Sequence, residues 1–278
     1  PLPADLPENW QYGQIVAPDG TEVGLTTQHG YNYLMQQVNA AQEGVNTLGQ
    51  SVEDLGSEIE NLPTDGIMLS GGGGVSRMPV SGEWYSVTYG NGKFVAVADT
   101  TNTAAYSTDG INWTPSTMPA SARWRSVTYG NGKFVAVAQN SATAAYSTDG
   151  ISWTQTNMPA STSWYSVTYG NGKFVAVASS NSNIAAYSTN GISWTQTTMP
   201  ASASWYSVTY GDGKFVAVAS VHRNIAAYST NGINWTQTTM PASLYWNSVT
   251  YGDGKFVAVA GSGNTAAYST DGISWTQA

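Results

Sequence analysis

Short runs of alternating polar and apolar residues recur along the chain from about residue 80 to its last residue. Each run carries the phrase SVTYG-(N/D)G-KFVAVA, and a tryptophan stands just before it, in steps of 40, 40, 41 and 41 residues. A second tryptophan recurs at the same period, at Trp113, Trp153, Trp194, Trp235 and Trp275. A period in this range indicates one supersecondary unit repeated in a solenoid, an array or a propeller.

Each unit is predicted to contain two β-hairpins. In the second copy, SVTY runs into Gly130-Asn131-Gly132 and continues as KFVAVA. An Asn-Gly pair between β-rich runs favours a type I′ hairpin, because both central residues need positive φ. Asp149-Gly150 predicts a second hairpin of the same chemistry, and Met158-Pro159 is expected to close the unit. Four antiparallel strands in about 40 residues are typical of a propeller blade.

The ends of the array predict a closed ring. Met-Pro follows the second tryptophan by five residues in the internal copies, whereas Ala278 stands three residues after Trp275. The matching piece appears upstream as Ser76-Arg77-Met78-Pro79. We therefore expect a mainly β fold with a five-bladed β-propeller over residues 78–278, its seam completed by residues 75–79. The alternative is a linear stack of hairpins with two exposed sheet edges.

Upstream of the repeats the apolar spacing changes to 4-3-4-3, which predicts a coiled-coil stalk over residues 31–63. The alternative is an amphipathic helix packed on its own chain. Pro63 ends the pattern, and residues 64–77, with four glycines at 71–74, form a predicted linker. The predicted oligomerisation seam consists of Leu34, Val38, Ala41, Val45, Leu48, Val52, Leu55, Ile59 and Leu62.

Composition excludes several classes of protein. The chain has no cysteine, so it is not a disulfide scaffold, and no apolar run approaches the ~20 residues of a membrane span. Its net charge is −8, with ten acids and one base before residue 78. No basic stripe for nucleic acid is present. The start, PLPADLPENW, lacks the features of a signal peptide, and nothing predicts a cofactor.

The segment ENWQYGQIVAPDGTEVGLTTQHGYNYLMQQVN, residues 8–39, resembles the N-terminal attachment segment of tail-fibre or receptor-binding proteins from phages and prophages of Gram-positive bacteria. The resemblance implies a virion or phage-tail-like particle, a tail or baseplate partner for residues 1–30, and a homotrimer. The β-branched residues of the seam slightly favour a dimer instead. We expect the trimer that the resemblance implies.

The phrase STDGINW, residues 107–113, and its four copies are similar to the Asp-box turn of sialidase-like propellers, S-x-D-x-G-x-x-W. The phrase lacks one residue between Asp and Gly, and two copies carry Asn190 or Asn231 in place of Asp. The motif is structural in that family, so the resemblance supports the fold alone.

Catalytic residues are sparse. The acids of the propeller that no other copy shares are Glu83 and Asp99, which could flank a glycosidic bond but do not stand out from ordinary loop residues. His29 and His222 are too isolated for a metal site or a catalytic triad. We therefore expect a protein without enzymatic activity and without a metal.

Differences between the copies are confined to one end of each unit. Strand order predicts both glycine turns at one end, while the loops between the second and third strands and the residues beside the first tryptophan lie at the other. Variable loops on a rigid scaffold are how binding surfaces are commonly built, although neutral drift also explains variation. Tyr, Trp, Asn and Arg side chains suit a sugar ligand; for the first tryptophan of each unit, burial between blades is the alternative. The predicted ligand-binding residues are Glu83, Trp84, Tyr85, Asp99, Asn102, Arg123, Trp124, Arg125, Gln139, Asn140, Trp164, Tyr165, Asn181, Trp205, Tyr206, His222, Arg223, Tyr245, Trp246, Asn247 and Asn264.

These observations together predict a receptor-binding fibre of a phage or phage-tail-like particle, made in the bacterial cytoplasm and acting outside the cell on a host-surface glycan. A bacterial lectin or adhesin is the first alternative, and a glycoside hydrolase is the second. An engineered consensus-like repeat is a third, because the copies are nearly identical.

Overall fold

A computed structural model describes residues 14–16, 22–24, 77–99, 101–221 and 224–278. The chain divides into two compact parts, residues 1–74 and residues 75–278. Within the described residues there is no helix, and therefore none that could span a membrane.

The described portion of the first part is one small antiparallel pair of strands, β1 (Gln14–Val16) and β2 (Glu22–Gly24), with Ile15 opposite Val23. The predicted stalk over residues 31–63 and the linker over residues 64–76 lie outside the described residues, as does most of the predicted attachment segment.

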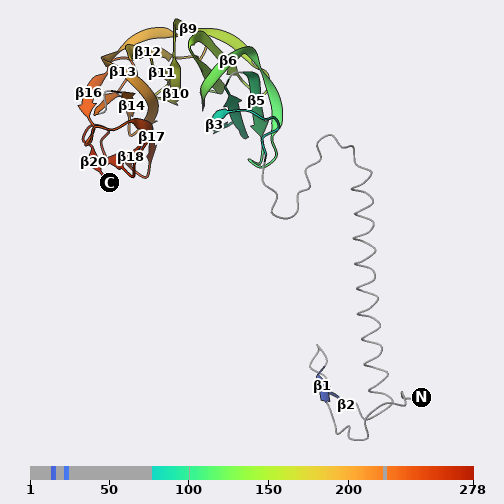
Figure 1. The fold of residues 1–278 in the computed structure, drawn as a ribbon. Helices are drawn as coiled ribbons and strands as arrows, with labels where there is room; N and C mark the ends of the chain where they lie inside the picture. Colours follow the sequence, from blue (N-terminus) through green and yellow to red (C-terminus); the bar gives the residue numbers. More distant parts are fainter. Residues whose placement is uncertain (1–13, 17–21, 25–76, 100, 222–223) are drawn as a thin grey trace. The chain divides into compact units, whose positions relative to one another are not determined.

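The second part is an array of antiparallel units arranged along an arc (Figure 1). Two seven-stranded sheets and one four-stranded sheet make it up, and each seven-stranded sheet is two four-stranded units that share one long strand. The first sheet contains β3 (Trp84–Gly90), β4 (Lys93–Ala98), β5 (Thr101–Ser107), β6 (Thr114–Gly130), β7 (Lys133–Gln139), β8 (Ser141–Ser147) and β9 (Thr154–Thr162).

The second sheet contains β10 (Trp164–Gly170), β11 (Lys173–Ala178), β12 (Ser182–Ser188), β13 (Thr195–Gly211), β14 (Lys214–Val221), β15 (Ile225–Ser229) and β16 (Thr236–Thr239). The third contains β17 (Trp246–Gly252), β18 (Lys255–Ala260), β19 (Ala266–Ser269) and β20 (Thr276–Gln277). The first strand of each unit, namely β3, the second half of β6, β10, the second half of β13, and β17, lies on the inner side of the arc (Figure 1).

Met-Pro does not end the strand in three of the units, contrary to the sequence-based prediction. Pro119 lies inside β6, Pro159 inside β9 and Pro200 inside β13. In β6 the ladder to β5 is regular up to Thr117 and shifts its register before Ala122, so Pro119 falls in the irregular stretch. Proline is tolerated there because no ladder hydrogen bond from its nitrogen is required.

The first turn of each unit is the predicted type I′ hairpin. In the second unit Gly130 pairs with Lys133, and both central residues have positive φ, 45° at Asn131 and 73° at Gly132. Asp212 and Asp253 adopt the same conformation in the last two units. Asn and Asp tolerate this region better than other residues with a side chain, which explains why only these two types occur at the position.

The second turn is longer than the predicted two-residue hairpin. Tyr146 pairs with Thr154, so residues 147–153 form a closed loop. The Ser147 hydroxyl accepts the amide of Gly150 and donates to Asp149, whose Oδ1 accepts the amides of Ile151 and Ser152. Asn190 and Asn231 make the same two amide contacts through a neutral side-chain oxygen.

Neighbouring units bury their apolar residues against each other. Between the first two units, Val95 and Val97 of β4 pack on a face made by Trp124, Val127 and Phe134. Equivalent residues form the clusters between the later units. The core of the array is therefore a series of interfaces between units, as expected for repeats that cannot bury an apolar face alone.

A tyrosine of each following unit covers a glycine of the unit before it. A Cβ built on Gly130 would lie only 2.0 Å from Cγ of Tyr169, and the same close approach occurs at Gly90, Gly170 and Gly211. At Gly252 nothing lies within 4 Å of such a Cβ. The covering tyrosines are accordingly half-buried between units, while Tyr89 of the first unit is 59% exposed.

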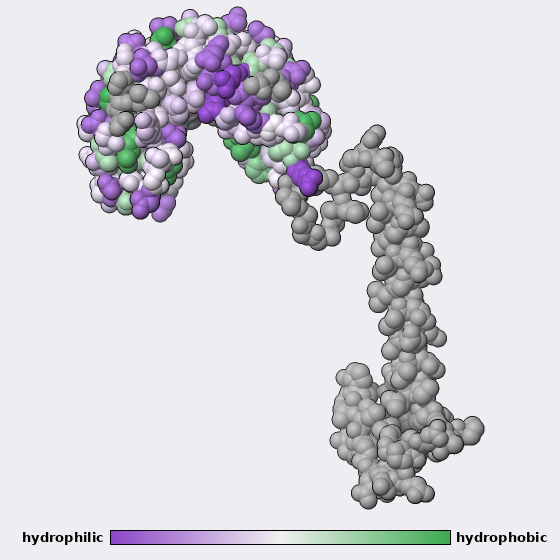
Figure 2. Space-filling model, viewed as in Figure 1, coloured by the Kyte–Doolittle hydropathy of each residue, from purple (hydrophilic) through white to green (hydrophobic). Residues whose placement is uncertain are grey.

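Both ends of the arc leave an apolar face uncovered. Val87 of the first unit is 58% exposed, although Val127 at the equivalent position is 5% exposed. Val257 and Val259 of the last unit are 38% and 45% exposed, although Val95 and Val97 are fully buried. Hydrophobic residues are visible near both ends of the arc in Figure 2.

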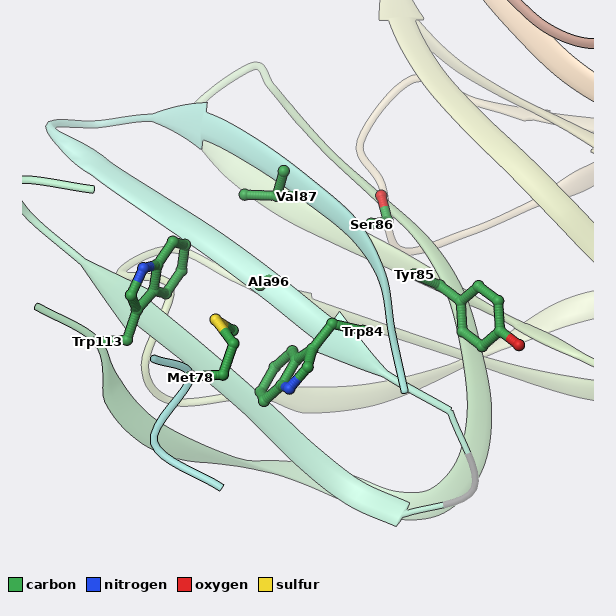
Figure 3. A pocket seen from close by; sticks show the side chains of 7 residues that line it. All are labelled: Met78, Trp84, Tyr85, Ser86, Val87, Ala96 and Trp113. Carbon is green, nitrogen blue, oxygen red and sulfur yellow. The ribbon is translucent and has the colours of Figure 1, made fainter. Parts of the chain in front are cut away.

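A pocket of about 280 Å³ marks the uncovered face of the first unit (Figure 3). Its apolar lining includes Met78, Trp84, Val87 and Trp113, and Met78 lies between the two indoles in this view. The equivalent face of the second unit, with Met118 and Trp124, is filled by Val95 and Val97. The pocket therefore lies on the face that a neighbouring unit covers elsewhere in the array.

The acids of the second turns link stability to pH. The pKa of Asp271 is lowered to about 2 by the amides of Ser274 and Ile273. Burial raises the pKa of Asp149, but the amides of Ile151 and Ser152 outweigh it and bring the value to about 2. Hydrogen bonds from Asn112 and Ile111 hold the pKa of Asp109 well below its usual range.

A carboxyl whose folded pKa lies below its unfolded value of about 3.9 stabilises the fold above that pH, and the contribution is lost as pH falls toward 2. We expect the triple variant Asp109→Asn, Asp149→Asn and Asp271→Asn to lose less stability than the parent between pH 4 and pH 2.5. Urea midpoints at both pH values measure this. An equal decrease in parent and variant would contradict the assignment.

Candidate functional site

The first strand of every unit contains a β-bulge directly after its tryptophan. In the third unit Trp164 pairs with Ala178 and Ser166 pairs with Val177, so Tyr165 is the extra residue. The same register shift occurs in the other units. A bulge re-aims the side chain of its extra residue and is common next to binding sites. The bulged residues, here called the bulge row, are Tyr85, Arg125, Tyr165, Tyr206 and Asn247.

Four members of the bulge row stack one on another across successive units. The Arg125 guanidinium carbon lies 3.8 Å from the ring centroid of Tyr85 and 4.5 Å from that of Tyr165. The rings of Tyr165 and Tyr206 have centroids 4.5 Å apart. Burial raises the pKa of the Tyr206 hydroxyl, and its hydrogen bond with Tyr165 acts in the same direction.

This geometry determines which atoms a ligand can meet. The ring faces are turned toward their neighbours in the row, so the faces of the internal members are covered. Ring edges and the guanidinium N–H groups remain, while the Tyr85 hydroxyl donates to Glu83 and the hydroxyls of Tyr165 and Tyr206 hydrogen-bond to each other. The row is therefore a polar edge suited to hydrogen bonding rather than a flat aromatic platform. In Figure 3 Tyr85 points away from the apolar pocket residues of its unit.

Hydrogen bonds confirm that the glycine turns lie at one end of the units and the variable loops at the other. The Asn131 side-chain amide donates to the Thr189 carbonyl, which places a first turn beside a second turn of the next unit. At the opposite end, the Ser163 hydroxyl beside a first tryptophan donates to Asn140 in the loop between the second and third strands of the preceding unit. The bulge row lies at this second end, here called the variable end.

Some variable residues connect neighbouring units. Arg123 donates from Nε to Asp99 Oδ1 at 2.9 Å and from Nη2 to Asp99 Oδ2 at 2.9 Å. Asp99 is buried, and the hydrogen bond and charge of its carboxylate raise the pKa of Arg123. Ser220 donates to Asn247 Oδ1 at 3.1 Å. Arg123 and Asp99, predicted to bind ligand, are thus assigned to an interface between units, and Asn140 and Asn247 also make contacts there.

The tryptophans predicted as ligand residues are core residues. Trp124, Trp164, Trp205 and Trp246 are fully buried, and each donates its indole N–H to a carbonyl four residues earlier. A ligand at the surface does not reach them. Trp84 is half-buried because its face belongs to the uncovered first unit. Invariance between copies pointed to this outcome, since every interface needs the same large side chain.

The remaining predicted residues are spread over the variable end. Glu83 is exposed and accepts the Tyr85 hydroxyl at 3.1 Å. Gln139 is half-buried, whereas Asn102, Asn181, Tyr245 and Asn264 are exposed. His222 and Arg223 lie outside the described residues. The sequence did not single out the bulge row as a set, because nothing in a strand's composition signals one extra residue.

Candidate metal ligands do not gather in the described portion of the chain. No three residues of the His, Cys, Asp and Glu types come close enough there to hold a metal ion. Glu83 is joined to Tyr85, and Asp99 is joined to Arg123 across an interface. The two carboxylates that a glycoside hydrolase would use are therefore each engaged by another side chain.

Comparison with known proteins finds a domain described as "DUF6242 beta propeller domain" over residues 78–204. Structural similarity extends further. Virginiamycin B lyase from Staphylococcus aureus is 17% identical, with a TM-score of 0.63 over 70% of this chain and 69% of that one.

YCF48 from Cyanidioschyzon merolae is 16% identical, with a TM-score of 0.55 over 73% of each chain. A structure of YCF48 bound to D1 peptide is 16% identical, with a TM-score of 0.56 over 72% of this chain and 67% of that one. No curated protein matches the sequence. At these identities the similarity shows the propeller fold alone.

The ion pair between units can be tested by a double-mutant cycle. We expect Arg123→Ala to lower the urea midpoint of unfolding, because the buried Asp99 carboxylate loses the two hydrogen bonds that Arg123 donates. Adding Asp99→Ser should restore most of that loss, since Ser179 and Ser220 occupy the equivalent position in two other units. Urea unfolding of the parent, both single variants and the double variant gives the coupling energy. Additive single effects would contradict the assignment.

Proposed function

We propose that this chain is a non-enzymatic receptor-binding protein that recognises a cell-surface glycan through the variable end of its propeller. The observation that supports this best is the bulge row. In every unit a β-bulge orients one side chain, and that residue is Tyr in some units, Arg in another and Asn in another. Irregularity retained in each copy, with chemistry that differs between copies, is typical of a functional surface on a rigid scaffold.

The chemistry of the row favours a sugar ligand. Phenol hydroxyls, a guanidinium group and an amide lie in a line across neighbouring units, and each can bind a sugar hydroxyl. The contacts among these side chains hold them in place, because Arg125 touches Tyr85 and Tyr165, and Tyr165 touches Tyr206. A preorganised surface loses less side-chain entropy when it binds.

The proposed setting is a phage or phage-tail-like particle. It rests on the resemblance of residues 8–39 to a tail-fibre attachment segment and on the heptad spacing that follows. Residues 1–30 would join a tail or baseplate protein, the heptads would make a homotrimeric stalk, and the propeller would act outside the cell. A bacterial lectin or adhesin is the alternative that uses the same binding surface.

We further propose that the units close into a five-bladed ring. The two uncovered faces are the two halves of the interface repeated inside the array, since Val257 and Val259 correspond to Val95 and Val97. Tyr89 is exposed, and Gly252 lacks the tyrosine that covers the equivalent glycines. Closure would bring Tyr89 onto Gly252 and bury both faces, which supplies a hydrophobic driving force.

Glycine-to-alanine variants test closure. We expect Gly130→Ala to destabilise the propeller by about 1–3 kcal/mol, because its Cβ meets Tyr169. Gly252→Ala should cost a similar amount if Tyr89 covers Gly252 in a closed ring. The midpoint of urea unfolding measures both. A change below about 0.5 kcal/mol for Gly252→Ala, with the full effect for Gly130→Ala, would show an open array.

Binding by the row can be tested with residues borrowed from the fifth unit. The variant Tyr85→Asn, Tyr165→Asn and Tyr206→Asn should fold, because Asn247 occupies the same bulge. We expect it to bind a panel of bacterial surface glycans at least about tenfold more weakly than the parent, since each lost hydrogen bond is worth roughly 1 kcal/mol.

The control Asp212→Asn and Asp253→Asn alters the opposite end to match Asn91, Asn131 and Asn171 of the other units. It should bind like the parent. A folded row variant that binds glycans and host cells as the parent does would overturn the proposal.

The enzymatic alternative is cleavage of the bound glycan; virginiamycin B lyase, a structural neighbour, is an enzyme, but at 17% identity that similarity extends to the fold alone. The same glycan panel distinguishes the two functions. Bound glycan should be recovered with unchanged mass after prolonged incubation, whereas shortened or unsaturated products would establish an enzyme.

A further inference from the structure

Arg125 is held by ring contacts that leave its hydrogen-bonding groups unused. The rings of Tyr85 and Tyr165 lie against the guanidinium at 3.8 Å and 4.5 Å from its central carbon. Stacking engages the faces of the planar group, while its five N–H donors point outward in the plane. Among the described residues, Arg125 forms neither a hydrogen bond nor an ion pair.

The contrast with Arg123 shows how an arginine that serves the fold is arranged here. Arg123 stands two residues earlier on the same strand and binds a buried carboxylate through Nε and Nη2. That carboxylate, Asp99, is thus occupied. The other acid close to the row, Glu83, accepts the Tyr85 hydroxyl. The charge of Arg125 is therefore not matched by a carboxylate of the described chain.

The position of Arg125 is also unlike a surface arginine. It is half-buried, occupies a bulge, and takes the place of the aromatic residue found at Tyr85, Tyr165 and Tyr206. A guanidinium fixed between two rings has little side-chain entropy left to lose when it pairs with an anion.

We infer that the glycan bound by the variable end carries an anionic group, a carboxylate or a phosphate, which Arg125 binds through its free N–H edge. This inference rests on the proposed function and specifies its ligand class. A planar guanidinium matches two oxygens of such a group in a bidentate pair, which is stronger than a neutral hydrogen bond. The tyrosine hydroxyls on both sides would bind neighbouring sugar hydroxyls.

The test uses three probes with the full chain: a uronic-acid oligosaccharide, its carboxyl-reduced derivative, and a glycerol-phosphate oligomer. We expect the parent to bind at least one anionic probe roughly 10- to 100-fold more tightly than the neutral derivative, the range that a charge-assisted hydrogen bond provides. Preference for the uronic acid or for the phosphate identifies the source of the anion.

Arg125→Tyr is the decisive variant, because three other units carry tyrosine there and the fold tolerates it. It should lose the preference for anionic probes and retain binding to the neutral derivative. Arg125→Lys should recover only part of the preference, since a lysine keeps the charge without the fork or the stacking. Lys133→Gln removes one positive charge at the opposite end of the same unit and should change nothing.

Equal binding of neutral and anionic probes by the parent overturns the inference and leaves glycan recognition intact. An equal loss in Lys133→Gln and Arg125→Tyr also overturns it, because the effect would then be one of net charge. Absence of binding to every probe and to a wider glycan panel overturns both the inference and the proposed function.

Discussion

The interface between consecutive units is the contact on which the rest of this propeller depends. No unit buries its own faces. Valines of one second strand fill the space over the tryptophan and phenylalanine of the next unit, and a tyrosine closes over a glycine that has no room for a Cβ. Every copy of the tyrosine and phenylalanine pair has ring centroids 4.7–4.8 Å apart. This uniform packing explains why the core phrase barely varies between copies.

Because packing between units constrains the residues of the strands, the sequence differences between copies lie mainly at the variable end, opposite the glycine turns. There the differences have two roles. Pairs such as Arg123 with Asp99 connect one unit to the next, so their variation is matched across an interface. The bulge row instead lies on the inner strands, where its side chains contact one another from unit to unit. Separating the two roles removes several charged and amide residues from the candidate ligand surface and leaves a shorter, ordered set.

Much of the scaffold could be predicted from the sequence. Asn131-Gly132 predicted a type I′ turn because few other pairs adopt two positive φ values, and the turn was confirmed. Three features escaped. The loop around Asp149 is longer than a hairpin because Ser147 and Asp149 satisfy its amides by themselves. Pro119 does not break its strand because it falls in an irregular part of the ladder. The tryptophans lie in the core, since their invariance reflected packing rather than recognition.

Features that depend on two distant positions could not be obtained from one sequence. The ion pair of Arg123 and Asp99 joins different units, and the stack of Tyr85, Arg125 and Tyr165 joins three. Each residue alone resembles an ordinary loop or strand residue. Only the register shift at each bulge, which composition does not encode, brings the three side chains into one row. The candidate site therefore emerged from strand pairing and ring contacts.

Amide hydrogen exchange of the full chain, with and without a surface polysaccharide of a cell to which it attaches, tests the central claim most directly. The account predicts slower exchange on binding around residues 83–86, 123–126, 163–166 and 204–207, and no change at the glycine turns around residues 130–133 and 171–174. Protection confined to the glycine turns or to residues 1–74, with unchanged exchange along the bulge row, would contradict it.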